Sequence, residues 1–216
     1  MLDIPFIFVI DCSKTMDVAD ISYIHQAALA AWRNHYLCDP LSTEYIYPVV
    51  ITYARNAMTH NEINERKCFQ VPALVRNETE DGDIASAIRA VDGLLSHWVS
   101  MPLQKKHRRK KSIVFILSNF LFHHEGEPVD CRPCEGRQVA RRVLACRIGD
   151  KSGKSQVDGI AKYVIQCSDN PRHFAEFAGS IFRSCLDVWP DALDCREGVD
   201  PPLGIHPFQA WVSPQL

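Results

Sequence analysis

Pro5-Phe6-Ile7-Phe8-Val9-Ile10-Asp11-Cys12-Ser13-Lys14-Thr15-Met16 is the stretch of sequence that decides the fold. Its apolar run, residues 6–10, is β-branched and aromatic and does not alternate with polar residues. Such runs form strands that are buried on both faces, mostly in parallel sheets covered by helices. Asp11, Ser13 and Thr15 follow at the carboxyl end of this strand, where open α/β sheets bind ligands. Their oxygens suit a hard cation such as Mg²⁺; alternatively, Asp11 and Ser13 only cap the next helix.

The composition is that of an ordinary globular protein. The chain has 216 residues, of which 46% are hydrophobic and 23% charged, and a net charge of -2, which points to no special class of partner. No apolar run reaches the roughly 18 residues that span a membrane, and the first residues lack the basic start of a signal peptide. We therefore expect a cytoplasmic protein, in which most of the nine cysteines are reduced thiols.

Apolar runs alternate with helical patterns along most of the chain. We expect three further central strands, at 49–54, 112–119 and 143–149, and a fifth strand at 162–165. Three long helices are expected at 21–37, 84–98 and 171–186. Pro48 is awkward inside a central strand. An edge strand at 68–75 and short helices at 136–142 and 157–161 complete the expected elements. The pattern predicts an α/β fold, Rossmann-like and doubly wound, with helices on both faces of a mostly parallel sheet.

Two parts of unequal size are expected. Residues 1–189 carry the alternating strands and helices and form one domain. Residues 190–216 carry five prolines and little regular pattern, so we expect a proline-rich C-terminal tail. Phe208 and Trp211 suggest that this tail packs on the domain.

The chain resembles a von Willebrand factor A (vWA) domain, and most of all the bacterial TerY-like proteins of tellurium-resistance and stress gene clusters. The resemblance covers roughly residues 3–187. It is carried by the opening stretch and by further motifs in the same order: Asp39-Pro40, Val49-Val50-Ile51-Thr52-Tyr53, Ile84-Ala85-Ser86-Ala87-Ile88, Leu117-Ser118-Asn119, Cys146-Arg147-Ile148-Gly149 and Phe174-Ala175-Glu176-Phe177.

This resemblance implies a metal-ion-dependent adhesion site (MIDAS), usually filled by Mg²⁺. The family pattern is Asp-x-Ser-x-Ser, a threonine in a second loop and an aspartate after a later strand. Asp11 and Ser13 match the first element, and Thr15 replaces its last serine. The second element is missing, because Gly82 stands where the threonine is usual, with Asp83 beside it. In the third element Asn119 replaces the aspartate and loses its charge.

Two interpretations of this degenerate site stay open. In the first, Asp83 restores the lost charge, and Mg²⁺ or another divalent cation is bound by Asp11, Ser13, Thr15, Asp83 and Asn119. In the second, Asp11 and Ser13 only hold loops together through hydrogen bonds. Asp83 is also predicted to be the N-cap or first-turn acid of the helix that follows it. The demanding coordination geometry of Mg²⁺ weakens the first interpretation.

The resemblance implies a protein–protein interaction module. We expect its loop face to contact a partner through Lys14, Gly82 and Phe120, with a partner carboxylate able to complete a metal shell or, without an ion, to dock against loop amides. TerY-like systems imply a kinase or a phosphatase encoded nearby, in a stress-response or phage-defence complex. We expect no enzyme activity, since the sequence has neither a glycine-rich phosphate loop nor a Gly-x-Ser-x-Gly elbow.

One loop gathers possible zinc ligands. His123 and His124 precede the Cys-x-x-Cys formed by Cys131 and Cys134. Together they would make a tetrahedral Zn²⁺ site, but the spacing is not that of a standard finger. We expect incidental loop thiols here, with a zinc site or a redox pair as the alternatives.

A basic segment offers the alternative function of nucleic-acid binding. Six positive charges stand between 105 and 111, at Lys105, Lys106, Arg108, Arg109, Lys110 and Lys111. Such a segment contacts phosphates, but it lacks an aromatic residue for base stacking. Because it precedes a strand, it is expected at the edge of the sheet opposite Asp11.

Overall fold

The computed structural model describes residues 2–38, 40–63, 69–102, 108–109, 112–121, 141–148, 161, 163–167, 170–187 and 212–214. Within them it contains eight strands, four α-helices and one π-helical segment. The strands are β1 (Leu2–Asp11), β2 (Ile46–Tyr53), β3 (Ala57–Thr59), β4 (Arg108–Arg109), β5 (Ser112–Ser118), β6 (Arg141–Arg147), β7 (Tyr163–Gln166) and β8 (Val212–Pro214). The helical elements are α1 (Val18–Ala31), η1 (Trp32–Tyr36), α2 (Pro40–Tyr45), α3 (Ile84–Ser100) and α4 (Pro171–Asp187).

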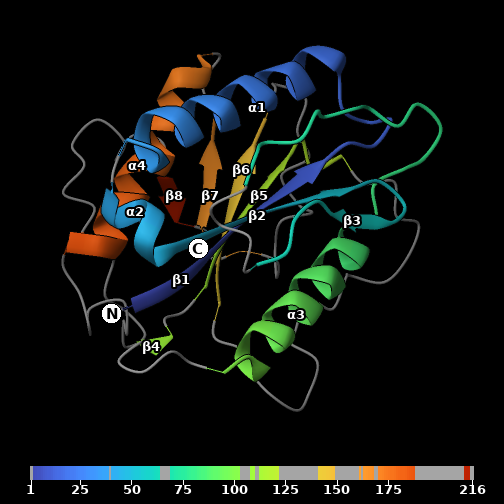
Figure 1. The fold of residues 1–216 in the computed structure, drawn as a ribbon. Helices are drawn as coiled ribbons and strands as arrows, with labels where there is room; N and C mark the ends of the chain where they lie inside the picture. The colour runs from blue at the N-terminus through green and yellow to red at the C-terminus, as the bar shows by residue number, and fades with distance from the viewer. Residues whose placement is uncertain are drawn as a thin grey trace.

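The strands form one sheet with β1 near its centre (Figure 1). Their order is β3-β2-β1-β5-β6-β7-β8, and β4 pairs with the start of β1. The pairs from β2 to β7 are parallel, whereas β3 and β8 run antiparallel at the two edges. The chain leaves β1 toward β2 on one side and returns through β5 on the other, which makes the β1–β5 boundary a topological switch point. The predicted doubly wound α/β fold is confirmed.

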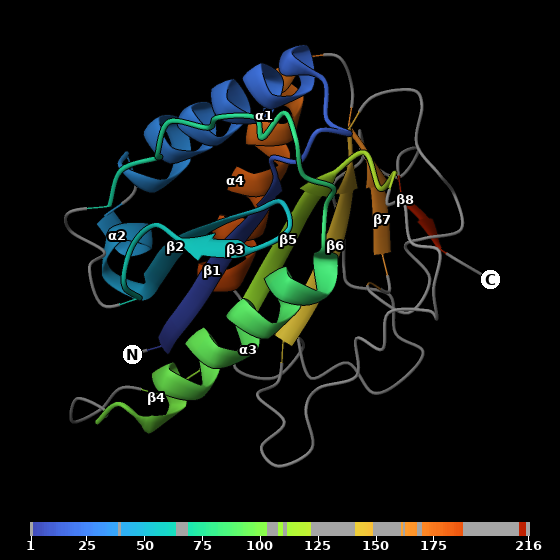
Figure 2. The ribbon, with the colours of Figure 1, turned by 90° about the vertical axis from the view of Figure 1, so that its right-hand side faces the viewer.

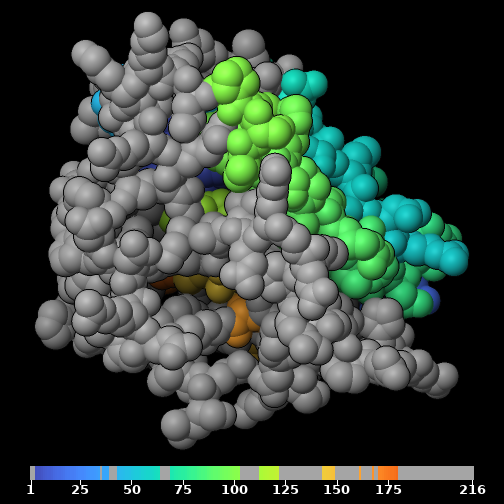
Figure 3. Space-filling view, turned by 90° about the horizontal axis from the view of Figure 1, so that it is seen from below, coloured from blue at the N-terminus to red at the C-terminus, as the bar shows by residue number. Residues whose placement is uncertain are grey.

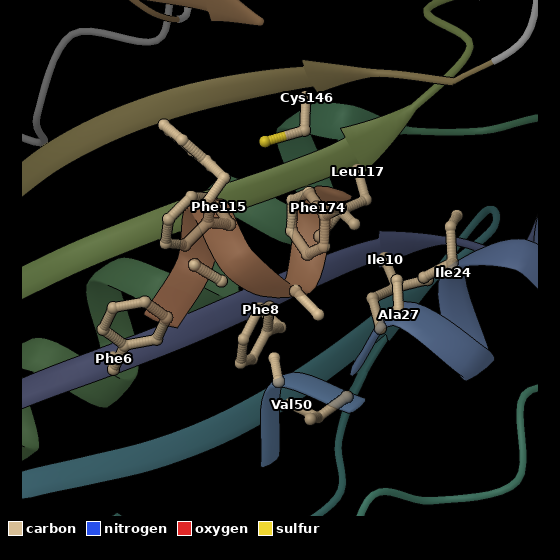
Figure 4. Close-up of a cluster of buried hydrophobic side chains, with 14 of the residues drawn as sticks. Phe6, Phe8, Ile10, Ile24, Ala27, Val50, Phe115, Leu117, Cys146 and Phe174 are labelled. Atoms are coloured by element: carbon tan, nitrogen blue, oxygen red, sulfur yellow. The ribbon is translucent and has the colours of Figure 1, made fainter. Parts of the chain in front are cut away.

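Helices cover both faces of the sheet (Figure 2). α1 and α4 lie on one face and α3 on the other. The core beneath α1 and α4 is built from every second residue of the central strands, including Phe6, Phe8 and Ile10 of β1, and from Phe174 and its neighbours on α4. Figure 4 shows these side chains interleaved between the sheet and the helices. The alternate residues Ile7 and Val9 are buried as well, so both faces of β1 are apolar, as its unalternating sequence predicts.

A second core lies beneath α3. Ile7 and Val9 of β1 pack there against Ile84, Val91 and Leu95 of the helix. The other flank of α3, green in Figure 3, lies on the molecular surface. Burial of one stripe of this helix explains why its apolar residues recur at helical spacing.

The prediction that the regular part of the second strand begins at Val49 is wrong, because β2 begins at Ile46 and includes Pro48. Pro48 pairs with Phe6 of β1 on one side. On the other side β3 reaches only Ile51, Thr52 and Tyr53. The missing N–H of Pro48 therefore faces a position without a strand partner, where proline is tolerated.

The Asn61 side chain takes the place of a strand partner beside Pro48. Its Nδ2 donates to the Pro48 carbonyl over 2.9 Å, and its Oδ1 accepts from the Val50 N–H over 3.1 Å. One asparagine thus continues the hydrogen bonding of β3 past the end of that strand.

The predicted edge strand at 68–75 is also wrong for the described part, because 69–75 form no strand. The edge is instead formed by β3. Residues 69–77 run alongside α1 (Figure 2). Phe69 is buried and meets Trp32 edge-on, with ring centroids 4.3 Å apart. Apolar content in this segment reflects packing on a helix and not strand pairing.

The remaining expectations have mixed outcomes. The helix expected at 21–37 is α1 followed by η1, and Pro40, expected to end it, opens α2, as suits a first helical position. Arg141 and Arg142 belong to β6 and not to a helix, while 136–140 and 157–160 lie outside the described residues. In the 190–216 segment, Val212–Pro214 pair with β7 as β8. Among the described residues no helix is long and apolar enough to cross a membrane.

Candidate functional site

Three polar residues end three neighbouring strands on one face of the sheet. Tyr53 is the register partner of Asp11. Ser118 follows Leu117, which pairs with Ile10, so it lies at the level of Asp11 on the other side. We call Tyr53, Asp11 and Ser118 the polar row. It occupies the carboxyl end of the sheet at the switch point, on the side of α3.

Asp11 lies at the centre of the polar row, and its carboxylate is fully buried. Oδ2 accepts a hydrogen bond from the Ser118 hydroxyl at 2.6 Å, and Oδ1 accepts one from the Ser13 N–H at 2.9 Å. Burial raises the pKa of Asp11 above its ordinary value, while the hydrogen bonds from Ser118 and Ser13 and the nearby Tyr53 hydroxyl lower it. Burial outweighs the hydrogen bonds.

The Tyr53 hydroxyl is close to Asp11 without a direct hydrogen bond to it. It is buried, and it has no partner of hydrogen-bonding geometry in the described structure. Its pKa is raised well above the ordinary value, first by burial and then by the charge of Asp11. A buried hydroxyl without a partner lowers the stability of the folded state.

The loop after β1 is held by hydrogen bonds within the loop and to the residue that follows β5. The Ser13 and Thr15 hydroxyl oxygens are 2.8 Å apart and share a hydrogen bond. Asn119 Nδ2 donates to the Thr15 carbonyl over 2.7 Å, and Asn119 Oδ1 accepts from the Leu121 N–H. Ser13 is fully buried and Asn119 nearly so. These side chains therefore hold two loops together.

The acidic loop, residues 77–83, is fixed to the same loop. The Asn77 N–H donates to the Cys12 carbonyl over 2.6 Å, and the Lys14 N–H donates to the Glu80 carbonyl over 2.9 Å. Lys14 Nζ also pairs with Asp81 Oδ2 at 2.9 Å, and Arg76 donates to the Lys14 carbonyl. Loops from three parts of the sequence thus form one continuous surface.

Asp83 is the N-cap of α3, as predicted for one of its two roles. Its Oδ1 accepts from the Ala85 N–H over 2.9 Å, and its Oδ2 lies 3.3 Å from an Arg89 nitrogen. Its backbone N–H donates to the Ala54 carbonyl. Both carboxylate oxygens thus serve the start of α3.

The three residues expected to contact a partner differ in exposure. Lys14 is exposed, whereas Gly82 is buried. Phe120 is fully buried in the core beneath α3, with a left-handed φ of 54°. Its N–H donates to the Ser118 hydroxyl over 2.9 Å. Of the three, only Lys14 presents its side chain at the surface.

The side chains of this site do not fit a Mg²⁺ ion. Their atoms are oxygens, as a hard cation prefers, but Mg²⁺ demands a nearly octahedral shell and gives up water reluctantly. Of Asp11, Ser13, Thr15 and Asn119, only Asp11 can carry a charge, and both its oxygens accept hydrogen bonds. In the described part of the chain, no three His, Cys, Asp or Glu side chains gather as metal ligands do.

Sequence reasoning did not single out Tyr53 and Ser118 as site residues. Both are the last residues of their strands. Aligning the carboxyl ends of the expected strands would have indicated them, because polar residues that end adjacent parallel strands lie together at one edge of the sheet.

The other predicted sites are placed only in part. Arg108 and Arg109 form β4 and pair with Leu2 and Asp3, at the amino end of β1, opposite Asp11 as expected. The rest of the basic segment, Lys105, Lys106, Lys110 and Lys111, lies outside the described residues, as do the zinc candidates His123, His124, Cys131 and Cys134.

Comparison with protein-family models and with characterised proteins gives no match. Solved structures do match. Proximal thread matrix protein 1 from the mussel byssus is 13% identical over 87% of this chain and 49% of its own, with a TM-score of 0.60. The ArnB paralog VWA2 from Sulfolobus acidocaldarius is 14% identical over 83% of this chain and 45% of its own, with a TM-score of 0.54.

An aerotolerance-related membrane protein from Bacteroides fragilis NCTC 9343 is 10% identical over 84% of this chain and 99% of its own, with a TM-score of 0.52. The chain spans about half the length of the mussel and Sulfolobus proteins. One structure of the mussel protein has a zinc-occupied MIDAS motif. Identities this low speak for the fold alone, and they agree with the sheet order and helix layers. The chain has the von Willebrand factor A fold.

Proposed function

We propose that this chain is a protein–protein interaction module that binds its partner with the loop face at the carboxyl ends of β1, β2 and β5. The observation that carries the proposal is the joining of the acidic loop to the loop after β1 through Asn77, Glu80 and Lys14. These contacts hold separate segments as one preformed surface. Preformed surfaces bind with a smaller loss of entropy than mobile loops.

The exposed residues of this face combine apolar and charged groups. Val75 is 76% exposed and Val18 is 68% exposed. Lys14, Asp17 and Glu78 are exposed as well. A mixture of apolar contacts and charges is typical of non-obligate interfaces.

We propose that the module acts by binding and not by catalysis. Cys12 is the thiol nearest the site, and burial and the charge of Asp11 raise its pKa to about 12. A thiol with that pKa stays protonated at neutral pH and is a poor nucleophile. The Asp11 carboxylate is engaged by two donors and is not poised as a general base.

The resemblance to TerY-like proteins supports a finer proposal about the partner. We propose that it is a protein of the same gene cluster, a kinase or a phosphatase, in a stress-response or defence complex. The test is co-expression of the chain with each cluster-encoded protein, followed by size-exclusion chromatography to detect a complex.

Surface variants test the loop face directly, once a complex is in hand. Val75→Asp and Lys14→Glu should each weaken the complex at least about tenfold, because one buries a new charge and the other reverses one. Val99→Asp is the matched control, because Val99 is 37% exposed near the far end of α3. Equal affinity of Val75→Asp, Lys14→Glu and wild type would contradict the proposal.

Nucleic-acid binding through residues 105–111 remains the alternative and is separable by the same variants. Because β4 lies at the amino end of β1, Arg108→Ser with Arg109→Ser should leave the protein complex intact. If those two substitutions abolish binding to DNA or RNA at low salt while Val75→Asp does not, the alternative function gains support.

A further inference from the structure

Two donors of the protein engage the buried carboxylate at the centre of the polar row. Asp11 Oδ2 has the Ser118 hydroxyl at 2.6 Å, and Asp11 Oδ1 has the Ser13 N–H at 2.9 Å. Ser118 itself is fully buried, and its oxygen also accepts from the Phe120 N–H.

Tyr53 places a second hydroxyl beside Asp11. Its ring belongs to the core beneath α3 and is fully buried, and its register partner is Asp11. The hydroxyl has no hydrogen-bond partner in the described structure. An unpaired buried donor next to a buried carboxylate is the group best placed to stabilise that carboxylate's charge.

We infer that the Asp11 carboxylate is satisfied within the protein by the Ser13 N–H and the Ser118 hydroxyl, with the Tyr53 hydroxyl beside it, and that these groups take the place of a divalent cation. Asp11 then joins the end of β1 to the end of β5 instead of ligating a metal. Partner binding at the loop face consequently needs no cation and no partner carboxylate, a consequence that rests on the function proposed above.

Three observations favour this role over a metal site. A cation at this site would neutralise only the charge of Asp11, since Asn119 is neutral and the Asp83 carboxylate caps α3 and pairs with Arg89. The Ser13 and Thr15 hydroxyls bond to each other. A cation ligated by Asp11 Oδ2 would also have to displace the Ser118 hydroxyl from a 2.6 Å hydrogen bond in a buried site.

The first test needs no partner. Purified chain, treated with chelator and dialysed, is titrated calorimetrically with Mg²⁺ and with Mn²⁺, and its melting temperature is recorded with each ion. We expect no saturable binding and no rise in melting temperature at millimolar concentrations. Saturable binding that Asp11→Asn abolishes would overturn the inference. The function proposed above does not depend on this result, because the loop face is tested by Val75→Asp.

The second test compares two serines of the same strand. Ser118 and Ser112 are both buried in β5, but the Ser112 hydroxyl has no hydrogen-bond partner among the described residues. Ser118→Ala should lower the melting temperature by at least about 4 °C more than Ser112→Ala, since only Ser118→Ala deprives a buried carboxylate of a donor. Equal shifts for the two variants would overturn the inference.

Tyr53→Phe removes the hydroxyl beside Asp11 without altering the packing of the ring. We expect a lower melting temperature in wild type background and no such loss in the Asp11→Asn background, because the hydroxyl then has no charge to stabilise. A Tyr53→Phe protein that is as stable as wild type, or more stable, would show that the Tyr53 hydroxyl does not stabilise the Asp11 carboxylate.

Discussion

Ser118 donates its hydroxyl hydrogen to Asp11 over 2.6 Å, although 107 residues separate the two in the sequence. The contact joins the ends of β1 and β5 at the point where the strand order reverses. In open α/β folds this is the position where a ligand is bound. Here the protein fills part of that position with its own hydroxyl group.

The stability of the protein should respond to pH through Asp11. Its folded-state pKa lies above the ordinary value of 3.8 because burial disfavours the charged form. The stabilising contribution is therefore fully present below pH 3.8 and is lost as the pH rises through the folded-state pKa. Relative to Asp11→Asn, the wild type should lose melting temperature as the pH rises above about 4. A difference that stays constant as the pH rises would contradict the raised pKa.

The cysteines should differ strongly in reactivity. The pKa of Cys12 is raised to about 12 by burial and by Asp11, whereas Cys38 is exposed. At pH 8 we expect Cys12 to be alkylated at least about 100-fold more slowly than Cys38 in the native protein. Peptide mass mapping after timed alkylation measures both rates. In denaturant the two rates should converge, and similar rates in the native state would contradict the burial of Cys12.

Phe120 should prefer glycine over alanine as its replacement. Phe120 is fully buried and has a φ of 54°, which only glycine adopts without cost. Phe120→Ala should cost about 3–5 kcal/mol from the lost packing. Phe120→Gly should be about 1 kcal/mol more stable than Phe120→Ala, since it relieves the left-handed backbone.

Phe115 is the matched control for this comparison. It is equally buried but lies within β5. There Phe115→Gly should be less stable than Phe115→Ala by about 0.5–1 kcal/mol, the usual order in a strand. Urea unfolding of the four variants measures both differences, and the same order at the two positions would contradict the role of the backbone at Phe120.

Asn61→Ala should destabilise the edge of the sheet by about 1–3 kcal/mol, because it leaves the Val50 N–H and the Pro48 carbonyl without their partner. Asn34→Ala, at an exposed position of η1, is the control and should change stability by less than about 0.5 kcal/mol. Hydrogen exchange at Val50 reports the same contact, and it should accelerate in Asn61→Ala alone.

The fold could be predicted because its main signals are local. The unalternating runs at 6–10 and 113–117 are apolar on both sides, and a sheet covered on both faces is what such runs require. The start of the second strand was predicted too late because of Pro48. Whether a proline is tolerated there depends on how far β3 extends along β2, which is decided by a different segment of the sequence. The apolar residues of 69–75 carry no sign of whether they pair with a strand or pack on α1.

The candidate site could be predicted in part. Asp11, Ser13 and Thr15 stand at alternate positions of one short stretch, so their grouping follows from local spacing. Tyr53 and Ser118 join them through strand register, which depends on the alignment of three strands across the whole sheet. The role of Asp83 was open because its carboxylate had two candidate uses. The Ala85 N–H now accounts for one of its oxygens and the Arg89 side chain for the other.

The hydrogen bonds from Asn77 to Cys12 and from Lys14 to Glu80 have a kinetic consequence. They exist in the unbound chain, so an approaching partner meets a surface whose backbone is already in place. Association then resembles the docking of two rigid bodies, with a rate set by encounter and orientation instead of loop rearrangement. Removing the first of these bonds with Asn77→Pro, which has no backbone N–H to donate to the Cys12 carbonyl, should slow the capture of a partner more than it speeds its release.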